Sequence, residues 1–277
     1  MTGAALAMAR PPRAGIGAVH RLRSWTPAVA VFVGFILVWE AVIRVFGIQR
    51  AILPSPSGIA GAFVAYFPEL YAAASYTFVE ALGGLILGVG AGIGVALVVA
   101  RWAGVRDTLL PFAVAVNAIP IVAFAPIANN WFGLASPVSK MVISGVIVFF
   151  PVAINTIRGL TLVDASALEL MRSYAFSERQ ILFRLRIPNA LPFLFTALKL
   201  ATTLSLIGAV VGEYFGAPFA SLGQYIVQQA AFFGFERSWA AIVWACGMGI
   251  AFYLVVLALE RAVIPWHASM RNLEVPA

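Results

Sequence analysis

Charged residues are in short supply in this 277-residue chain, at 10% of the sequence. Soluble domains carry about a quarter charged residues, so this chain has too few charges to cover a water-exposed surface of its size. Apolar residues reach 62%, and the mean hydropathy is +0.96. Intrinsic disorder is excluded too, because it requires low hydrophobicity and high charge. The composition therefore argues against a water-soluble enzyme.

Cysteine and histidine are also scarce, with one cysteine, Cys246, and two histidines, His20 and His267. A single cysteine cannot form a disulfide within the chain. Because Cys246 lies in an apolar run, we expect it to be a small buried hydrophobic residue. The sequence contains no Cys/His cluster with metal-ligand spacing and no Ser-His-Asp set within the apolar runs. It therefore predicts neither a metal site nor a catalytic site, and we do not expect an enzyme.

Long apolar runs dominate what is present. A membrane-spanning helix needs about 20 mostly apolar residues, and the sequence predicts an all-α integral membrane protein with six transmembrane helices. We expect one transmembrane domain at 27–265, between a segment at 1–26 and a tail at 266–277. The segment at 1–26 carries four arginines and leads into a full-length span. This arrangement is typical of an uncleaved membrane helix rather than a signal peptide. The six predicted spans are 27–46, 77–100, 108–128, 138–157, 189–212 and 239–263.

The formal net charge of +7 reflects an uneven placement of basic residues. With the N-terminus placed in the cytoplasm, thirteen Lys and Arg residues near the span ends fall inside and four fall outside, which is the bias expected of membrane proteins. These residues lie between apolar runs rather than along one stripe, so they indicate topology and not nucleic-acid binding. Both termini are predicted to be cytoplasmic. The four outside positions are Arg44, Arg50, Lys140 and Arg237.

The predicted internal loop at 158–188 concentrates charge. It holds eight of the 29 charged residues, and from Asp164 to Leu185 it contains neither Pro nor Gly, so a helix is allowed throughout. Apolar residues recur near the helical period, which predicts a short amphipathic helix. Such a helix can insert into a groove on a cytoplasmic partner, although a solvated connector would also account for the charges. The apolar positions are Leu168, Met171, Ala175 and Leu182.

Several charged residues fall within the predicted spans, where each costs about 2.5–3.5 kcal/mol at a span centre and less near an end. Glu40 lies one helical turn before Arg44, so a local ion pair explains both residues. Lys199 could reach toward the cytoplasm, and Glu260 lies close to the inner surface. The remaining two, Glu80 and Glu213, lie near the outer ends of their spans, where they could line the external mouth of a pathway or serve in anchoring and packing.

Glycines repeat every fourth residue in the second span, at Gly84, Gly88 and Gly92, and again at Gly90 and Gly94. This small-xxx-small pattern allows two helix backbones to approach closely. A phosphate-binding loop is not indicated, because the chain contains no Gly-Lys pair. The pattern predicts close packing of the second span against another helix.

The third predicted span carries prolines at 111, 120 and 126 and an asparagine at 117. Interior prolines kink a helix and free backbone carbonyls, which is tolerated where the helix is buried in protein or lines a wet cavity. We expect this span to lie against the pathway, with Asn117 and Pro120 as candidate lining residues; a kink buried in the bundle is the alternative.

The internal loop resembles the E-A-A-x-x-x-G…I-x-L-P loop of the permeases of bacterial binding-protein-dependent ABC importers. The matching residues begin with Glu169-Leu170-Met171-Arg172-Ser173-Tyr174-Ala175 and continue with Ile187-Pro188 and Ala190-Leu191-Pro192. Further matches are Leu53-Pro54-Ser55-Pro56, Ile119-Pro120, Trp131-Phe132-Gly133 and Gly208-Ala209-Val210-Val211-Gly212-Glu213. The resemblance covers about residues 30–265, and its nearest branch is similar to the nitrate, sulfonate and taurine permeases.

The resemblance implies a six-span permease subunit of the bacterial inner membrane that pairs with a second copy of itself. It implies a cytoplasmic ABC ATPase dimer, which would bind ATP and Mg²⁺ in place of this chain, and an extracytoplasmic solute-binding protein. The internal loop would form a coupling helix that docks on the ATPase. By position, the coupling residues carried over are Glu169, Leu170, Met171 and Ala175, flanked by Arg172 and Tyr174, with Asp164, Ala165 and Leu168 in the same expected helix.

The sequence departs from the family pattern in three places, the first being Leu170-Met171, where the family has Ala-Ala. Ala175 stands where the family has glycine, so the turn is expected to be either helical or strained. Thr77-Phe78-Val79-Glu80 differs from the sulfonate-type pattern and looks more like the permeases for pyrimidine precursors or riboflavin. The expected solute is a small organic anion or heterocycle. An ion-coupled secondary transporter is the alternative function, and a structural membrane protein is a third.

Overall fold

The computed structural model describes residues 16–102, 120–217 and 220–265, together with positions 104, 111, 113 and 115. Within these ranges the regular structure is entirely helical. The chain divides into two compact units, 1–59 and 60–277, which are considered separately.

The first unit is built on α1 (Ile16–Phe46). Its stretch Thr26–Phe46 is long and apolar enough to cross a membrane, as predicted for the first span. The predicted ion pair is confirmed, because Arg44 Nη2 lies 2.6 Å from Glu40 Oε1. Glu40 also accepts the backbone N–H and the hydroxyl of Ser57, at 3.0 and 2.8 Å. The carboxylate therefore caps the first turn of α2 (Pro56–Ala65), a contact that the sequence pattern did not indicate.

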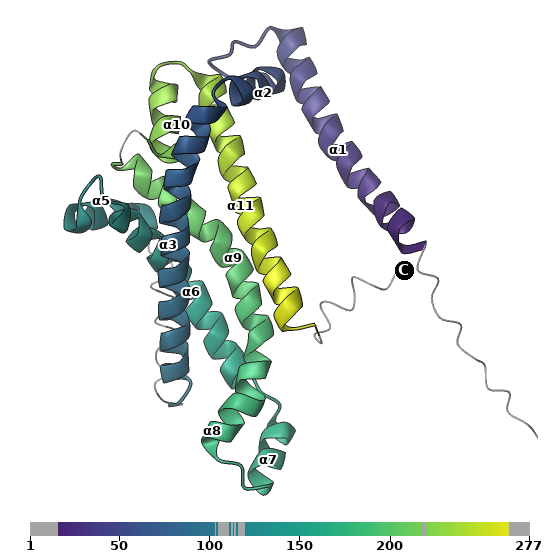
Figure 1. Cartoon of the computed structure of the whole chain (residues 1–277), viewed down its shortest axis with the longest axis vertical. Helices are drawn as coiled ribbons and strands as arrows, with labels where there is room; N and C mark the ends of the chain where they lie inside the picture. Colours follow the sequence, from purple (N-terminus) through teal and green to yellow (C-terminus); the bar gives the residue numbers. More distant parts are fainter. Residues whose placement is uncertain are drawn as a thin grey trace, which may run out of the picture. The chain divides into compact units, whose positions relative to one another are not determined.

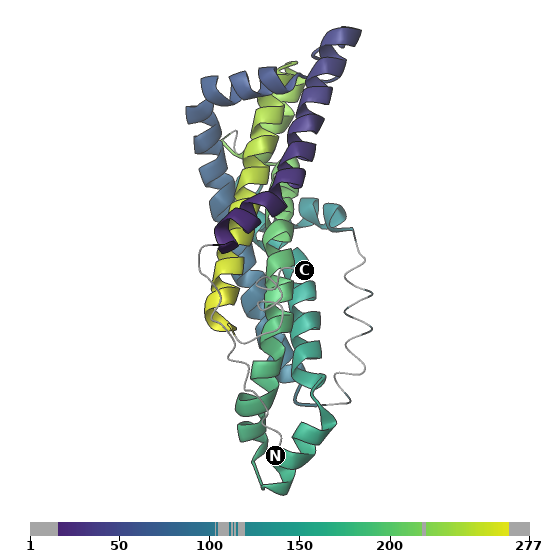
Figure 2. The ribbon, with the colours of Figure 1, turned by 90° about the vertical axis from the view of Figure 1, so that its right-hand side faces the viewer.

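The second unit is a bundle of long helices that run side by side (Figures 1 and 2). Short helices extend the bundle at both ends, and α5 packs against α6. The long helices are α3 (Phe67–Val99), α6 (Pro137–Thr161), α9 (Ile187–Tyr214) and α11 (Phe235–Val263). The shorter elements are α5 (Ile121–Phe132), α7 (Ala165–Ser173), α8 (Glu178–Ile181), a π-helical turn η1 (Leu182–Arg186) and α10 (Leu222–Ala231).

Five helices of the described residues are long and apolar enough to cross a membrane. They correspond to the first, second, fourth, fifth and sixth predicted spans. The third predicted span, 108–128, lies mostly outside the described residues, so the count of six stays a prediction. The second span begins about ten residues earlier than predicted, at Phe67, because Pro68 occupies the start of α3, where its missing N–H costs nothing.

The glycine pattern of the second span packs α3 against α6, as predicted. A Cβ added at Gly84 would lie 2.2 Å from the Cβ of Ser144, and one added at Gly88 would lie 2.5 Å from the carbonyl oxygen of Gly145. Gly92 makes a similar approach to α6, and all three glycines are buried. In contrast, a Cβ at Gly90 or Gly94 would meet no described atom within 4 Å. Only the first of the two glycine repeats therefore serves this interface.

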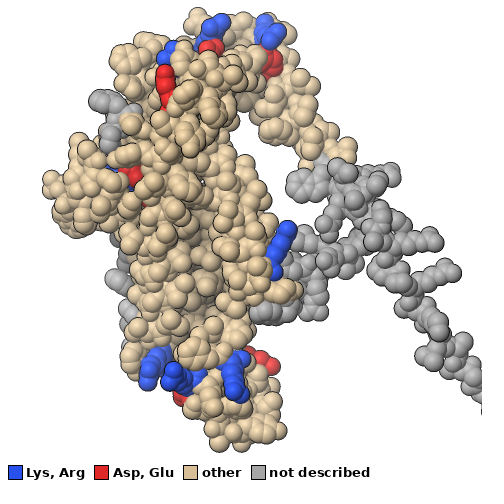
Figure 3. All heavy atoms as spheres, viewed as in Figure 1, with Lys and Arg blue, Asp and Glu red and all other residues tan. Residues whose placement is uncertain are grey.

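Basic side chains gather at one end of the bundle. Figure 3 shows a group of Lys and Arg side chains around the end that carries α7 and α8, below a long and mostly uncharged face. We call this the α7 end, and the opposite end the α10 end. The separation of charged and apolar zones is the pattern of a membrane-embedded bundle. The arginines near the α7 end are Arg158, Arg172, Arg179, Arg184 and Arg186.

Candidate functional site

The internal loop forms a helical hairpin at the α7 end. Asp164 begins α7 by accepting the backbone N–H of Ser166 at 3.0 Å, which is the N-cap bond that Asp favours. None of the described residues of α7 is buried. The second arm, α8, starts with a capping box in which Ser177 and Gln180 exchange hydrogen bonds. The Ser-x-x-Gln spacing was a sequence signal for this second start.

The uninterrupted helix that the sequence allowed from Asp164 to Leu185 is not formed. Phe176 N–H bonds to the carbonyl of Met171 at 3.1 Å, and Ala175 N–H bonds to the carbonyl of Arg172 at 2.9 Å. Together these two bonds are a Schellman motif, which ends α7. Ala175 has a φ of +55°, the left-handed conformation that glycine adopts most easily. Of the two expectations for this position, the strained turn is the one observed.

The hairpin exposes most of the predicted coupling residues. The side chains of Leu170 and Tyr174 are 57% and 71% exposed, and Leu168 and Met171 are half-buried. The other predicted positions are exposed on the same hairpin: Asp164, Ala165, Glu169, Arg172 and Ala175. An exposed apolar face among charges is a surface suited to docking.

The hairpin is firmly held by the bundle. The Asn189 side chain donates to the carbonyl oxygens of Gly159 and Leu162 at 2.8 and 3.0 Å, which ties the start of α9 to the end of α6. Ile181 is fully buried. The apolar helix continues from Glu178 to Tyr214, so the second arm of the hairpin and α9 form one continuous rod through the bundle.

A second cluster of polar residues is buried toward the α10 end. Glu80, Lys140 and Glu213, from α3, α6 and α9, are all fully buried. Glu213 interacts electrostatically with both Glu80 and Lys140. Lys140 Nζ donates to the carbonyl of Leu134. Neither carboxylate oxygen of Glu80 has a hydrogen-bond partner among the described residues. The structure thus brings the two predicted pathway glutamates together inside one subunit.

The structure places one of the other two predicted pathway residues. Asn117 lies outside the described residues. Pro120 is exposed and begins α5, so it does not kink a helix interior. Asn129, from the end of α5, is the residue that reaches the cluster, with its amide 3.5 Å from the carbonyl oxygen of Gly212. The described residues contain no group of three or more His, Cys, Asp or Glu side chains that could hold a metal.

Lys199 of α9 pairs with Glu260 of α11. Its ammonium lies 2.9 and 3.1 Å from the two carboxylate oxygens of Glu260. The Glu260 side chain is 3% exposed and that of Lys199 is 23% exposed. Sequence reasoning missed this pair because the two residues are 61 positions apart. The ion pair joins α9 to α11.

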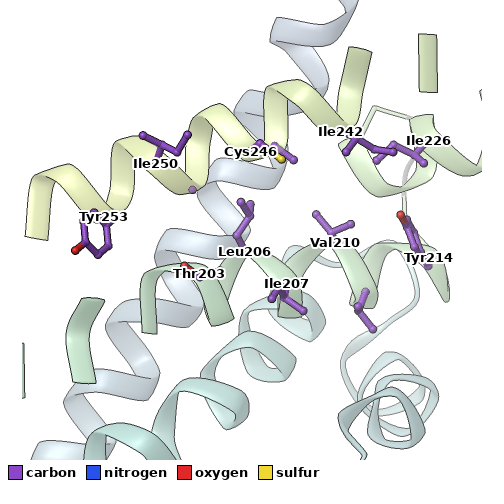
Figure 4. Close-up of a pocket in the computed structure, with 13 residues that line it drawn as sticks. Thr203, Leu206, Ile207, Val210, Tyr214, Ile226, Ile242, Cys246, Ile250 and Tyr253 are labelled. Atoms are coloured by element: carbon purple, nitrogen blue, oxygen red, sulfur yellow. The ribbon is translucent and has the colours of Figure 1, made fainter. Parts of the chain in front are cut away.

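An apolar groove of about 620 Å³ runs between α9 and α11 and is bounded at one end by α10 (Figure 4). Leu206 and Val210 from α9 face Ile242 and Ile250 from α11. Cys246 lies on this groove and is exposed. The expectation that Cys246 is buried was therefore wrong, because an apolar residue of a membrane helix can stay uncovered by protein at little cost where lipid tails are as apolar as the protein interior.

Comparison with known proteins assigns the chain to a family. Residues 84–266 match the model of the binding-protein-dependent transport system inner membrane component. The chain therefore belongs to this family of ABC transporter permeases and is an integral membrane protein.

Among its relatives is the formylaminopyrimidine transport permease protein ThiX of Halalkalibacterium halodurans. It is 31% identical to this chain, over 85% of this chain and 94% of the relative. The riboflavin transport system permease protein RibX of Chloroflexus aurantiacus is also 31% identical, over 83% of this chain and 86% of the relative. Both relatives are named as transport permease proteins. A crystal structure of an amino acid ABC transporter with histidines shares the fold, with a TM-score of 0.59, 17% identity, and coverage of 72% of this chain and 96% of that chain.

Proposed function

We propose that this chain is the membrane permease subunit of an ABC importer and that it acts as a pair with a second copy of itself. The α7 end faces the cytoplasm of a bacterium, both termini lie on that side of the inner membrane, and α7 docks on a cytoplasmic ABC ATPase dimer. ATP and Mg²⁺ bind to the ATPase, and an extracytoplasmic solute-binding protein delivers the solute. The observation that carries the proposal is the exposed α7 hairpin at the basic end of a bundle from this family.

The geometry gives the hairpin a means of moving the bundle. A force on α7 passes through the Schellman turn to α8 and then into α9, because the helix from Glu178 to Tyr214 is continuous. Because the Asn189 side chain bonds to the end of α6, α6 moves together with the start of α9. Nucleotide shifts the bundle between inward-facing and outward-facing states only if the ATPase has a different affinity for each state.

We propose a nitrogen heterocycle as the solute. Two relatives at 31% identity carry names for formylaminopyrimidine and riboflavin transport, whereas the relatives named for aliphatic sulfonates are 26% identical. Glu80 supports the same choice, since a glutamate at this position of the second span resembles the pattern of permeases for pyrimidine precursors or riboflavin. Binding of labelled pyrimidines and riboflavin by the cognate solute-binding protein tests this proposal.

The docking proposal is tested with Leu170→Arg, which places a charge on the exposed face of α7. The expected result is loss of the ATPase subunit from the purified complex, because burying an unpaired arginine at an interface is costly. Phe232→Arg is the matched control: Phe232 is 75% exposed at the α10 end, and this variant should keep the ATPase subunit. Solute uptake that continues in a Leu170→Arg complex lacking the ATPase would overturn the proposal and favour an ion-coupled transporter.

A further inference from the structure

The start of α10 is capped by other helices and not by its own residues. The first N–H groups of a helix have no partner within the helix. Ser221 stands at the N-cap position but makes no side-chain cap bond, and its buried hydroxyl has no partner among the described residues. Leu222 N–H instead donates to Thr77 Oγ1 of α3 at 2.9 Å, and Gly223 N–H donates to Glu213 Oε2 of α9 at 2.6 Å.

The two capping side chains also bond to each other. Thr77 Oγ1 lies 2.6 Å from Glu213 Oε1, so Glu213 uses both of its carboxylate oxygens. Thr77 and Glu213 are fully buried. A carboxylate at a helix N-terminus is favoured by the partial positive charge of the helix dipole. These contacts join three helices, α3, α9 and α10, at one point.

Gly223 leaves room for the Glu213 carboxylate beside the first turn of α10. A Cβ at Gly223 would lie 2.7 Å from Glu213 Oε2, so a side chain at this position would push the carboxylate away. Two other titratable side chains interact with Glu213: Lys140 of α6, which attracts its carboxylate, and Glu80 of α3. Close to the α10 end, Tyr225 hydroxyl is 3.5 Å from the Glu69 carboxylate. Burial, and then the charge of Glu69, raise the pKa of Tyr225, so this hydroxyl remains a donor.

We propose that Thr77 and Glu213 are positioning residues that form a latch, which we call the α10 latch, and that the latch makes α10 follow the movements of α9. Glu213 is in the last turn of α9, and the same rod begins at Glu178 in the hairpin. The α10 latch therefore connects the α7 hairpin to a short helix at the opposite end of the bundle. The meaning of this connection in transport rests on the proposed function, whereas the latch itself does not.

The latch is tested by hydrogen exchange of the full chain in lipid nanodiscs, followed by mass spectrometry of the segment 216–232. Thr77→Val and Glu213→Leu should each raise exchange in this segment by about tenfold or more, since Thr77→Val removes the acceptor of the Leu222 N–H and Glu213→Leu removes the charged acceptor of the Gly223 N–H. Thr77→Ser keeps the hydroxyl and should restore slow exchange. Thr202→Val is the matched control, because Thr202 is a buried threonine of α9 that donates only to the carbonyl of Lys199; this variant should leave the segment unchanged.

Unchanged exchange in Thr77→Val and Glu213→Leu would overturn the latch. Exchange that rises equally in α3 and α9 would also overturn it, because that result reports a general loss of packing.

The link to α9 is tested on the complex with the ATPase subunit, with ATP and Mg²⁺ as the probe. In the wild-type complex, nucleotide should change exchange in the segment 216–232, and in Glu213→Leu the exchange should be fast with or without nucleotide. A wild-type segment that does not respond to nucleotide would overturn the claim that α10 follows α9. Failure of the docking proposal is recognised separately, since no complex with the ATPase subunit would then be recovered.

Discussion

Ala175 shows how one residue can hold a strained turn at the proposed docking surface. Its left-handed φ of +55° costs about 1–2 kcal/mol for a residue with a Cβ. Glycine would remove that strain but would lose about 0.5–1 kcal/mol of conformational entropy on folding. We predict that Ala175→Gly stabilises the hairpin by up to about 1 kcal/mol, seen as slower hydrogen exchange across 165–181. Ala165→Gly, in the ordinary helical first turn of α7, should speed exchange in the same segment. Faster exchange in Ala175→Gly would contradict this account.

The Lys199–Glu260 pair illustrates the cost of a buried charge at the scale of single residues. Lys199→Met leaves the Glu260 carboxylate, 3% exposed, without its cation. Removing one partner of a buried pair destabilises a protein by about 3–5 kcal/mol, whereas replacing both by apolar residues is often neutral. We predict that Lys199→Met lowers the thermal unfolding temperature in detergent, toward the lower end of that range because Lys199 is partly exposed. The double variant Lys199→Met with Glu260→Leu should recover most of the loss. Additive losses would show that the pair does not act as a unit.

At the scale of elements, the interface between α3 and α6 depends on which face of α3 a glycine occupies. A methyl group at Gly88 would meet the Gly145 carbonyl at 2.5 Å, whereas one at Gly90 would meet no described atom within 4 Å. We predict that Gly88→Ala destabilises the bundle by about 1–3 kcal/mol through overpacking. Gly90→Ala should be neutral or stabilising by up to about 1 kcal/mol, since alanine is the better helix former. Thermal unfolding of the two variants in the same detergent measures the difference. Equal destabilisation would mean that both glycines contact a neighbouring helix.

The sequence indicated the helices of the bundle well because their signals are local. Apolar runs predicted the five spans that the described residues contain. The spacing of Gly84, Gly88 and Gly92 predicted a close interface between two helices. The absence of Pro and Gly allowed a helix throughout the loop and gave no signal for the break after α7. The start of the second helix was nevertheless encoded locally, by the capping box of Ser177 and Gln180.

The buried polar contacts could not be read from the sequence in the same way. Thr77 and Glu213 are 136 positions apart, and Lys199 and Glu260 are 61 positions apart. No periodicity of one helix specifies which residue of another helix it meets. A glutamate near the end of a span has the same local pattern whether it lines a pathway or caps a neighbouring helix. Tertiary packing decides between the two, and in the described bundle it places Glu213 at the start of α10.

At the scale of the whole molecule, the placement of basic residues predicts which end faces the cytoplasm. The predicted topology puts thirteen basic residues on the same side of the membrane as the loop that contains α7 and four on the other side, so the α7 hairpin should be reachable only from the cytoplasm. We predict that, with Cys246→Ala removing the exposed native thiol, Leu170→Cys reacts with a membrane-impermeant maleimide in inverted vesicles and not in intact spheroplasts. Phe232→Cys, at the α10 end, should show the opposite pattern. An ATPase that consumes cytoplasmic ATP can bind the hairpin only if the hairpin lies on the cytoplasmic side of the membrane. Labelling of Leu170→Cys from outside would therefore rule out α7 as the docking helix, while leaving the fold and the glycine interface intact.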